Sequence, residues 1–294
     1  MRKLFILSAA FVAVLAACNR EEANNAPGRG KEITVEAAIG TTSKVTTTGD
    51  AATFDTGDKI ALYAWTGSAA SVPAEKVVNG VENTLGADGK WTPATPMLWA
   101  DMVTPHYFIG IYPSKAVTSF TADTYTLNTS NYEASDLLVA VNATGLKASE
   151  NPVSLTFDHM LAKLFVNLTF RNQWSSEPTV SAVSVAAKSA ATVDYLAKAL
   201  TATGTAAPVA LTKDANAAWS GLQVPQAGVR TITITIEGKN YVFTHTEDIP
   251  LAKGKSTTVN LIVGRDKIEL ADPVNISNWI PGSTIDNGEA QTED

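Results

Sequence analysis

Residues Asn151–Phe170 read NPVSLTFDHMLAKLFVNLTF, and their apolar alternation changes phase in the middle. Val153, Leu155 and Phe157 occupy odd positions, which is the two-residue period of a half-buried strand. In the second half the apolar residues occupy even positions, so one unbroken strand would turn its two halves towards opposite faces of a sheet. Either a bulge or a crossing between two β-domains is expected near 159–162. We favour the crossing, because about 130 residues, enough for a domain, lie on each side.

Short apolar runs with the same period recur at roughly ten-residue spacing along the chain. The strands predicted in this way are 31–39, 59–65, 106–112, 136–141, 153–157, 164–170, 180–187, 230–237, 240–245 and 257–263. This pattern predicts an all-β protein with two tandem β-sandwiches, one over 31–161 and one over 162–294 that includes a C-terminal tail.

In the second half, three segments suggest a hairpin turn, a short helix and additional strands. Between strands 230–237 and 240–245, Glu237–Asn240 is expected to supply a hairpin turn. Val193–Leu200 has a spacing compatible with two helical turns. In the tail, the apolar pieces 267–270 and 274–280 could complete the second sheet or pair with another subunit.

The N-terminus has the composition of a secretory signal peptide over residues 1–17, with Arg2-Lys3 followed by an apolar run and small residues. The run of about 14 apolar residues is short for a membrane span. It ends in Leu15-Ala16-Ala17-Cys18, and Cys18 is the only cysteine of the chain. A leucine, two small residues and a cysteine match the lipobox of bacterial lipoproteins. We therefore predict that Cys18 is acylated and anchors the chain to a membrane.

The next segment, 18–30, is polar and is expected to be a flexible tether. Within it, Glu21-Glu22 resembles the acidic export signal of surface lipoproteins in Bacteroidales-type bacteria. The predicted location is thus the outer face of the cell outer membrane. An ordinary signal peptide followed by a chance cysteine is the alternative.

The charge of the chain excludes several partners. The formal net charge is −7, and loss of Arg2 and Lys3 with the signal peptide makes it −9. Nucleic acid and anionic membranes require clustered positive charge, so neither is a predicted partner.

Residues suited to catalysis or metal binding are scarce. His106, His159 and His245 lie in separate strand-like runs and lack the spacing of metal ligands. Asp158 adjoins His159, but neighbouring residues of a strand point to opposite faces, so their side chains cannot pair. No catalytic residue, metal site or cofactor is predicted. The tryptophans are interpreted as core residues rather than sugar-stacking platforms.

Four sequence motifs of the chain together resemble those of a known protein family. They are the lipobox at Cys18, 54–64 (FDTGDKIALYA), 135–140 (SDLLVA) and 153–164 (VSLTFDHMLAKL). Together they resemble the fimbrillin family of Bacteroidales-type bacteria, the lipoprotein precursors of type V pili and their tip and anchor subunits. Residues 276–279 (ISNW) also look like the closing strand of that family.

This resemblance implies two transthyretin-like Greek-key β-sandwiches and removal of the first strand, here Ile33–Ile39, by a trypsin-like surface protease. The cut would fall in the loop Gly40–Gly57. The vacated groove would expose unpaired backbone groups beside an apolar trough until a strand from a neighbouring subunit fills it. The arginine that the family has at the cut is absent, so Lys44 is the candidate processing site, although an arginine-specific enzyme would leave it intact. A cut at Arg29 would release the protein from its lipid without opening a groove.

The function favoured by these features is a shaft, tip or anchor subunit of a type V pilus, which assembles with copies of itself or with related subunits by strand exchange. The main alternative is a surface lipoprotein that never polymerises and binds glycan or host protein. That alternative predicts an intact first strand and clustered exposed aromatic side chains. A hydrolase would need converging carboxylates or histidines, which the sequence does not place together.

Overall fold

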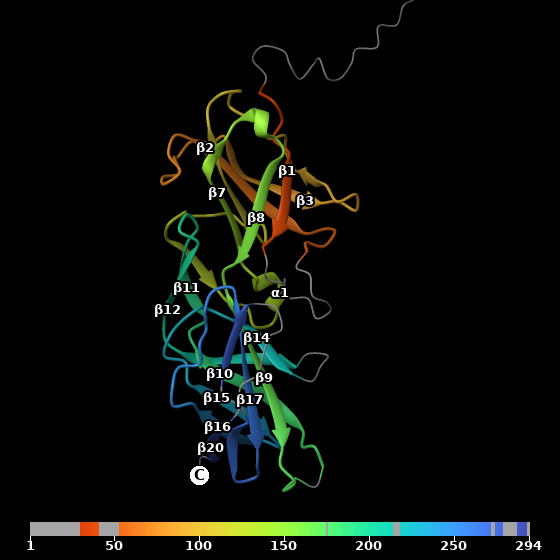
Figure 1. Cartoon of the computed structure of the whole chain (residues 1–294), viewed down its shortest axis with the longest axis vertical. Helices are drawn as coiled ribbons and strands as arrows, with labels where there is room; N and C mark the ends of the chain where they lie inside the picture. The colour runs from red at the N-terminus through yellow and green to blue at the C-terminus, as the bar shows by residue number, and fades with distance from the viewer. Residues whose placement is uncertain are drawn as a thin grey trace, which may run out of the picture.

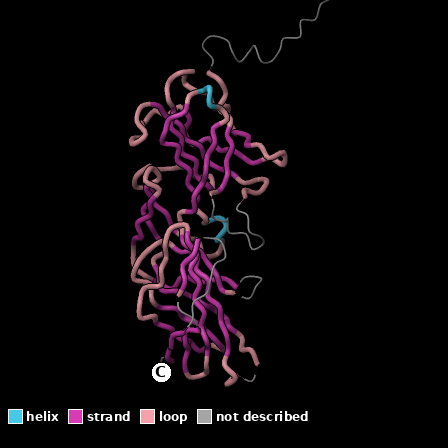
Figure 2. Tube along the Cα trace, in the orientation of Figure 1, coloured by secondary structure: helices cyan, strands magenta, loops and turns pink. Residues whose placement is uncertain are grey.

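The computed structural model describes residues 30–40, 53–174, 176–213, 218–271, 274–278 and 287–292. Figure 1 shows an elongated chain in which two sheets lie end to end along the long axis. Strands dominate the described residues, and their helical structure is confined to α1 (Tyr132–Ser135) and the 3₁₀ turn η2 (Ala148–Glu150) (Figure 2). No helix in this part of the chain is long and apolar enough to cross a membrane. The all-β prediction is confirmed.

The first sheet has seven described strands, all from the N-terminal half of the chain. Their spatial order is β1 (Val35–Ile39), β8 (Val153–His159), β7 (Leu138–Leu146), β5 (His106–Tyr112), β2 (Lys59–Thr66), β3 (Val78–Leu85) and β4 (Trp91–Pro93). The two end strands, β1 and β4, approach each other within 8 Å between Cα atoms. The sheet is therefore rolled, with a seam between β1 and β4.

The second sheet has ten described strands. Their order is β18 (Lys267–Ala271), β20 (Asn287–Thr292), β16 (Lys239–Thr244), β15 (Thr231–Ile236), β10 (Val180–Ala187), β13 (Ala207–Lys213), β14 (Trp219–Gln223), β9 (Ala162–Phe170), β17 (Lys255–Val263) and β19 (Asn275–Asn278). Because β17 also pairs with β18, the order closes into a ring. The tail pieces predicted at 267–270 and 274–280 thus join this sheet, through β18 and β19, within the described residues.

The phase inversion marks a crossing between sheets rather than a bulge. Strand β8 ends the first half at His159, and β9 opens the second sheet at Ala162. Leu155 and Phe157 before the crossing are buried, as are Leu164 and Val166 after it. Each half of the segment therefore turns its apolar side chains into a different core.

A small third sheet joins the two halves of the chain. Its strands are β6 (Asp123–Thr126), β11 (Ala190–Asp194) and β12 (Ala199–Thr203), with β11 in the middle. Strand β6 comes from the long connection between β5 and β7, whereas β11 and β12 belong to the second half. Trp65 and Tyr195, again from opposite halves, share one buried apolar cluster. The division into 31–161 and 162–294 stays a prediction, and this third sheet spans it.

The helical interpretation of Val193–Leu200 is wrong. The segment is the turn of the β11–β12 hairpin, and Lys198 adopts a left-handed conformation with φ 47°. The Asp194 Oδ1 atom accepts a hydrogen bond from the Ala197 N–H at 2.8 Å, which stabilises the turn. Burial of Val193 and Tyr195, two positions apart, follows the period of a strand.

The turn predicted at Glu237–Asn240 is shorter than expected. Pairing between β15 and β16 continues to Ile236 and Lys239, which leaves Glu237 and Gly238 as the turn. Their φ angles are 50° and 81°, as a two-residue type I′ hairpin requires.

Candidate functional site

The N-terminal segment 30–40 docks on two different parts of the first sheet. The Ile33 N–H donates to the Met97 carbonyl at 2.8 Å, and the Trp99 N–H donates to the Lys31 carbonyl at 2.9 Å. Further along, β1 pairs in parallel with β8 over its whole length. The first strand is thus an edge strand that is held at its start by the chain following β4.

Side chains of the first strand alternate between core and solvent. Ile33 and Val35 are only 2% and 6% exposed, whereas Thr34 and Glu36 are exposed. Burial of two β-branched apolar side chains stabilises the docked strand by roughly 3–6 kcal/mol in total.

Polar contacts fix the position of this strand along the sheet. The Thr34 N–H donates to Asn151 Oδ1 at 2.9 Å, and the Asn151 amide donates to Thr34 Oγ1 at 2.8 Å. The Lys31 Nζ atom donates to the Ala148 carbonyl at 3.1 Å. These contacts, together with the backbone pairing, set the register of β1 against β8.

A groove of about 680 Å³ lies along β1 at the seam of the first sheet. Its lining includes β1 itself, Phe54, Leu85 and Trp91. The Phe54 ring packs edge-on against Trp91 at 5.2 Å, Phe157 at 5.3 Å and Tyr112 at 5.5 Å between ring centroids. An aromatic floor beside a strand edge suits an extended peptide better than a small polar substrate.

The predicted lipidation and processing sites, Cys18, Arg29 and Lys44, lie outside the described residues. Their roles stay predictions. The described strand β1 lies between Arg29 and Lys44 in the sequence, so a cut at each position would have the different consequence expected above.

A model of the fimbrillin-like family matches residues 43–279, which is most of the chain. The chain belongs to the fimbrillin-like family. The predicted family resemblance is therefore confirmed. A comparison with curated proteins gives no significant match.

Solved structures share the fold of this fimbrillin-like chain. A proposed cell adhesion protein from Bacteroides uniformis ATCC 8492 is 18% identical with a TM-score of 0.66, over 84% of this chain and 99% of its own. A proposed cell adhesion protein from Bacteroides ovatus ATCC 8483 is 16% identical with a TM-score of 0.66, over 86% and 99%. A fimbrial protein from Bacteroides vulgatus ATCC 8482 is 13% identical with a TM-score of 0.52, over 84% and 99%. The likeness confirms the predicted fold class.

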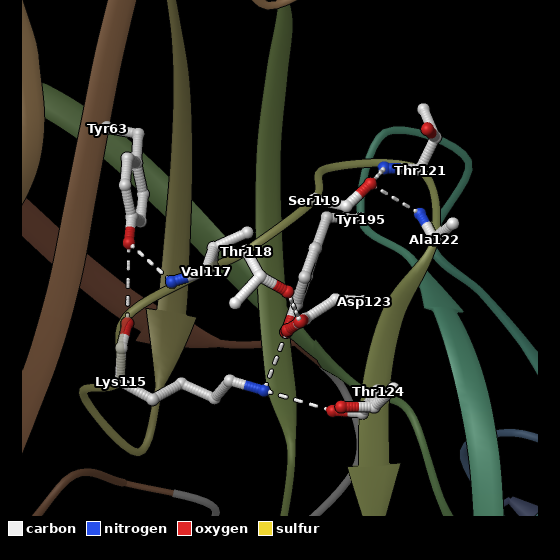
Figure 3. Close-up of polar contacts among 10 residues, drawn as sticks. All are labelled: Tyr63, Lys115, Val117, Thr118, Ser119, Thr121, Ala122, Asp123, Thr124 and Tyr195. Carbon is white, nitrogen blue, oxygen red and sulfur yellow. Dashed lines mark hydrogen bonds and ion pairs between the residues drawn. The ribbon is translucent and has the colours of Figure 1, made fainter.

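A buried polar cluster lies where the halves of the fimbrillin-like chain meet (Figure 3). Asp123 is 2% exposed, accepts hydrogen bonds from the hydroxyls of Thr118 at 2.6 Å and Tyr195 at 2.8 Å, and pairs with Lys115 at 2.9 Å. Burial raises the pKa of Asp123, but the donors from Lys115, Thr118 and Tyr195 outweigh it and lower the pKa to about 2. Burial also raises the pKa of Tyr195, and the bond to Asp123 adds to that effect. The cluster therefore holds β6 against the β11–β12 turn.

His159 belongs to a buried pair rather than to an accessible site. Its Nδ1 atom lies 2.9 Å from Asp136 Oδ1, and the two side chains are 0% and 1% exposed. Asp158 turns away from His159 and pairs with Lys198 at 2.5 Å, as the strand alternation predicts. No substrate reaches a pair that is buried in this way. Within the described residues, no group of three His, Cys, Asp or Glu side chains could hold a metal ion.

Asp136 and Asp123 are the polar residues that the sequence interpretation missed. Each is a single acidic residue whose partner lies far away in the sequence, so no local pattern marks it. The tryptophan interpretation is confirmed where the structure describes it, because five tryptophans are buried: Trp65, Trp91, Trp99, Trp174 and Trp219. Trp279 lies outside the described residues.

Proposed function

We propose that this chain is a structural subunit of a cell-surface type V pilus that assembles by strand exchange after removal of its first strand. Membership of the fimbrillin-like family supports a fimbrial or adhesive role at the cell surface. One observation carries the strand exchange: β1 ends the first sheet, and its only strand partner among the described residues is β8. An edge strand can leave a sheet without separating any other pair of strands.

Loss of the first strand would leave a defined acceptor. The backbone edge of Val153–Phe157 would lose its partner, and the spaces that Ile33 and Val35 fill would open. Unpaired backbone groups beside an exposed apolar trough are costly in water. A neighbouring subunit whose strand has the same alternation would restore both the ladder and the burial.

The proposal includes the membrane anchor. Cys18 would carry the acyl chains that hold the precursor on the outer face of the outer membrane, and 18–30 would be its tether. A cut at Lys44 would remove the anchor and β1 together, so release from the lipid and opening of the groove would occur in one step. The partners would be copies of this chain or related fimbrial subunits. The chain would act as a structural protein and not as an enzyme.

The test uses the chain from Asn19 onward, treated with limiting amounts of a protease that cuts after lysine and arginine. Two variants serve as controls for cleavage after position 44: Lys44→Arg keeps a basic residue there, and Lys44→Gln removes it. The wild type and Lys44→Arg should be cut after position 44, lose the first strand and form multimers that dissociate on heating. An arginine-specific protease should produce the same result with Lys44→Arg alone.

The results that would overturn this function are equally specific. A wild-type chain that stays whole at Lys44, or is cut there and remains monomeric by intact mass and unheated gel, excludes assembly by this route. A cut at Arg29 alone serves as the internal control, because β1 is retained and no multimer is expected. The non-polymerising alternative requires exposed aromatic clusters, whereas the exposed large apolar side chains in the described part are Leu98, Met102, Val103 and Ile276.

A further inference from the structure

We propose that the groove along β1 binds an extended strand from another protein, basic on its solvent face, while β1 stays in place. The inference goes beyond strand exchange, because the added strand would pair with the outer edge of β1 rather than replace it. It requires no cut at Lys44.

Along the first strand, the backbone N–H and C=O groups of successive residues point to opposite edges of the strand. The Thr34 carbonyl accepts from an N–H of β8 at 2.8 Å, and the Gly40 N–H donates to a carbonyl of β8 at 2.8 Å. Even-numbered residues therefore turn their backbone groups towards β8. The odd-numbered residue Ile33 turns the other way, and its N–H donates to the Met97 carbonyl at 2.8 Å.

By the same alternation, Val35, Ala37 and Ile39 point their N–H and C=O groups away from β8. No strand in the described part of the chain pairs with them. The chain on the opposite side of the seam is poorly equipped to do so, because Pro93 and Pro96 have no N–H to donate. The outer edge of β1 consequently keeps donors and acceptors that suit an incoming strand.

The groove supplies part of the space that such a strand needs. Since β1 and β4 approach within 8 Å between Cα atoms, less than the roughly 9.6 Å of two strand spacings, the added strand would also widen the seam. From Val35 to Ile39 the edge spans about 13 Å at about 3.3 Å per residue, which corresponds to a strand of about five residues. Phe54, Leu85 and Trp91 line the groove and contact apolar side chains from inside the sheet. An incoming strand would place an apolar side chain against them at every second position.

Charge identifies the solvent face of the occupant. Glu36 is exposed on the outward face of β1, so a lysine or arginine on the adjacent strand would pair with it. Lys90 lines the groove and can pair with a carboxylate further along the same strand. A folded second copy is a poorer occupant of this intact edge, because two chains of net charge −9 without the signal peptide repel each other and no vacated trough has to be filled.

The test uses the uncut chain from Asn19 and an acetylated, amidated octapeptide that alternates valine with lysine and threonine. Residue-resolved amide hydrogen exchange is the measurement. Without peptide, the amides of Val35, Ala37 and Ile39 should exchange faster than those of Glu36 and Ala38. With peptide, the odd-numbered amides should gain at least tenfold protection while the even-numbered amides keep theirs.

Each other outcome of the exchange measurement contradicts the proposal. Loss of protection at the even-numbered amides means that the peptide replaces β1, which supports strand exchange but overturns strand addition. Equal protection with a peptide in which glutamate substitutes for lysine overturns the charge preference. Concentration-dependent protection of the odd-numbered amides without peptide assigns the edge to a second copy. Absence of binding overturns the proposal but leaves the function tested at Lys44 untouched.

A proline variant isolates the outer edge. Ala37→Pro removes the outward N–H at the centre of the edge and leaves the pairing of even-numbered residues with β8, so it should weaken peptide binding at least tenfold. Ala37→Val keeps that N–H and is the matched control, which should bind as the wild type does. Equal binding by both variants, with unchanged protection of the even-numbered amides, would show that the edge of β1 is not the site.

Discussion

Tyr195, in the turn between β11 and β12, donates a 2.8 Å hydrogen bond to Asp123 in β6, 72 residues earlier in the chain. Both side chains are buried, at 0% and 2% exposure. The Tyr195 ring packs in the same cluster as Trp65 and Ile109 of the first sheet. A turn from the second half is thus anchored beneath the first sheet by an aromatic ring and a hydroxyl. This contact adds a non-covalent link between the two halves to the chain crossing at 159–162.

Tyr195→Phe keeps the ring and removes the hydroxyl, so Asp123 loses one of its donors. A hydrogen bond to a charged group contributes roughly 1.5–3 kcal/mol, and we expect the free energy of unfolding to fall by about 2 kcal/mol. Urea denaturation measures the change. Tyr125→Phe is the matched control, because Tyr125 donates at 2.6 Å to the neutral Ser135 carbonyl. Its expected loss is about 1 kcal/mol, and equal losses would contradict a charge-assisted bond.

Acid should weaken the same cluster. The pKa of Asp123 is about 2 in the folded chain, against about 3.9 for an unperturbed aspartate. A lowered folded-state pKa stabilises the fold above the unfolded value, and this contribution, about 2 kcal/mol, is lost as the pH falls from about 4 to about 2. The measurement compares urea unfolding of the wild type and Asp123→Asn between these pH values. The stability difference between them should shrink with acid, and a constant difference would show that Asp123 titrates normally.

Gly30→Ala should loosen the first strand without altering the core. A Cβ atom at Gly30 would overlap the carbonyl oxygen of Trp99, so the segment must shift away from the chain after β4. We expect amide exchange at Ile33, whose N–H bonds to Met97, to be at least tenfold faster than in the wild type. Gly89→Ala is the control, because its φ of 76° places the strain in the turn before β4 and a Cβ there meets no atom within 4 Å. Unchanged exchange at Ile33 in Gly30→Ala would refute the steric argument.

The strands were predictable because each carries its signal locally, as side chains that alternate between core and solvent. The phase inversion around His159 was equally local, and it located the crossing between sheets. The helical prediction for Val193–Leu200 was wrong because it also used only local signals. Alanine and leucine fit a helix when the burial of Tyr195 is unknown. Burial under a sheet from the other half of the chain then imposed the period of a strand.

The polar sites were not predictable, because their partners meet only after folding. Asp136 and His159 are 23 residues apart, and Tyr195 reaches Asp123 across 72 residues. The open edge of β1 was likewise not predictable from the sequence, since it depends on which backbone groups face β8. The sequence did indicate that the first strand is special, through the family resemblance, but not which of its two edges stays unpaired.

The pairing of His159 with Asp136, rather than with its neighbour Asp158, can be measured by double-mutant cycles. Removal of one partner leaves the other buried without the hydrogen bond between them, so Asp136→Ala and His159→Ala should each lower the free energy of unfolding by about 1–3 kcal/mol. Their effects should be non-additive by about 1–3 kcal/mol, because the side chains are in contact. Asp158→Ala removes a partly exposed ion pair with Lys198 and should lower stability by at most about 1 kcal/mol. Its coupling to His159→Ala should be near zero, because adjacent residues of β8 face opposite sides; coupling as strong as that of Asp136 would contradict the assignment.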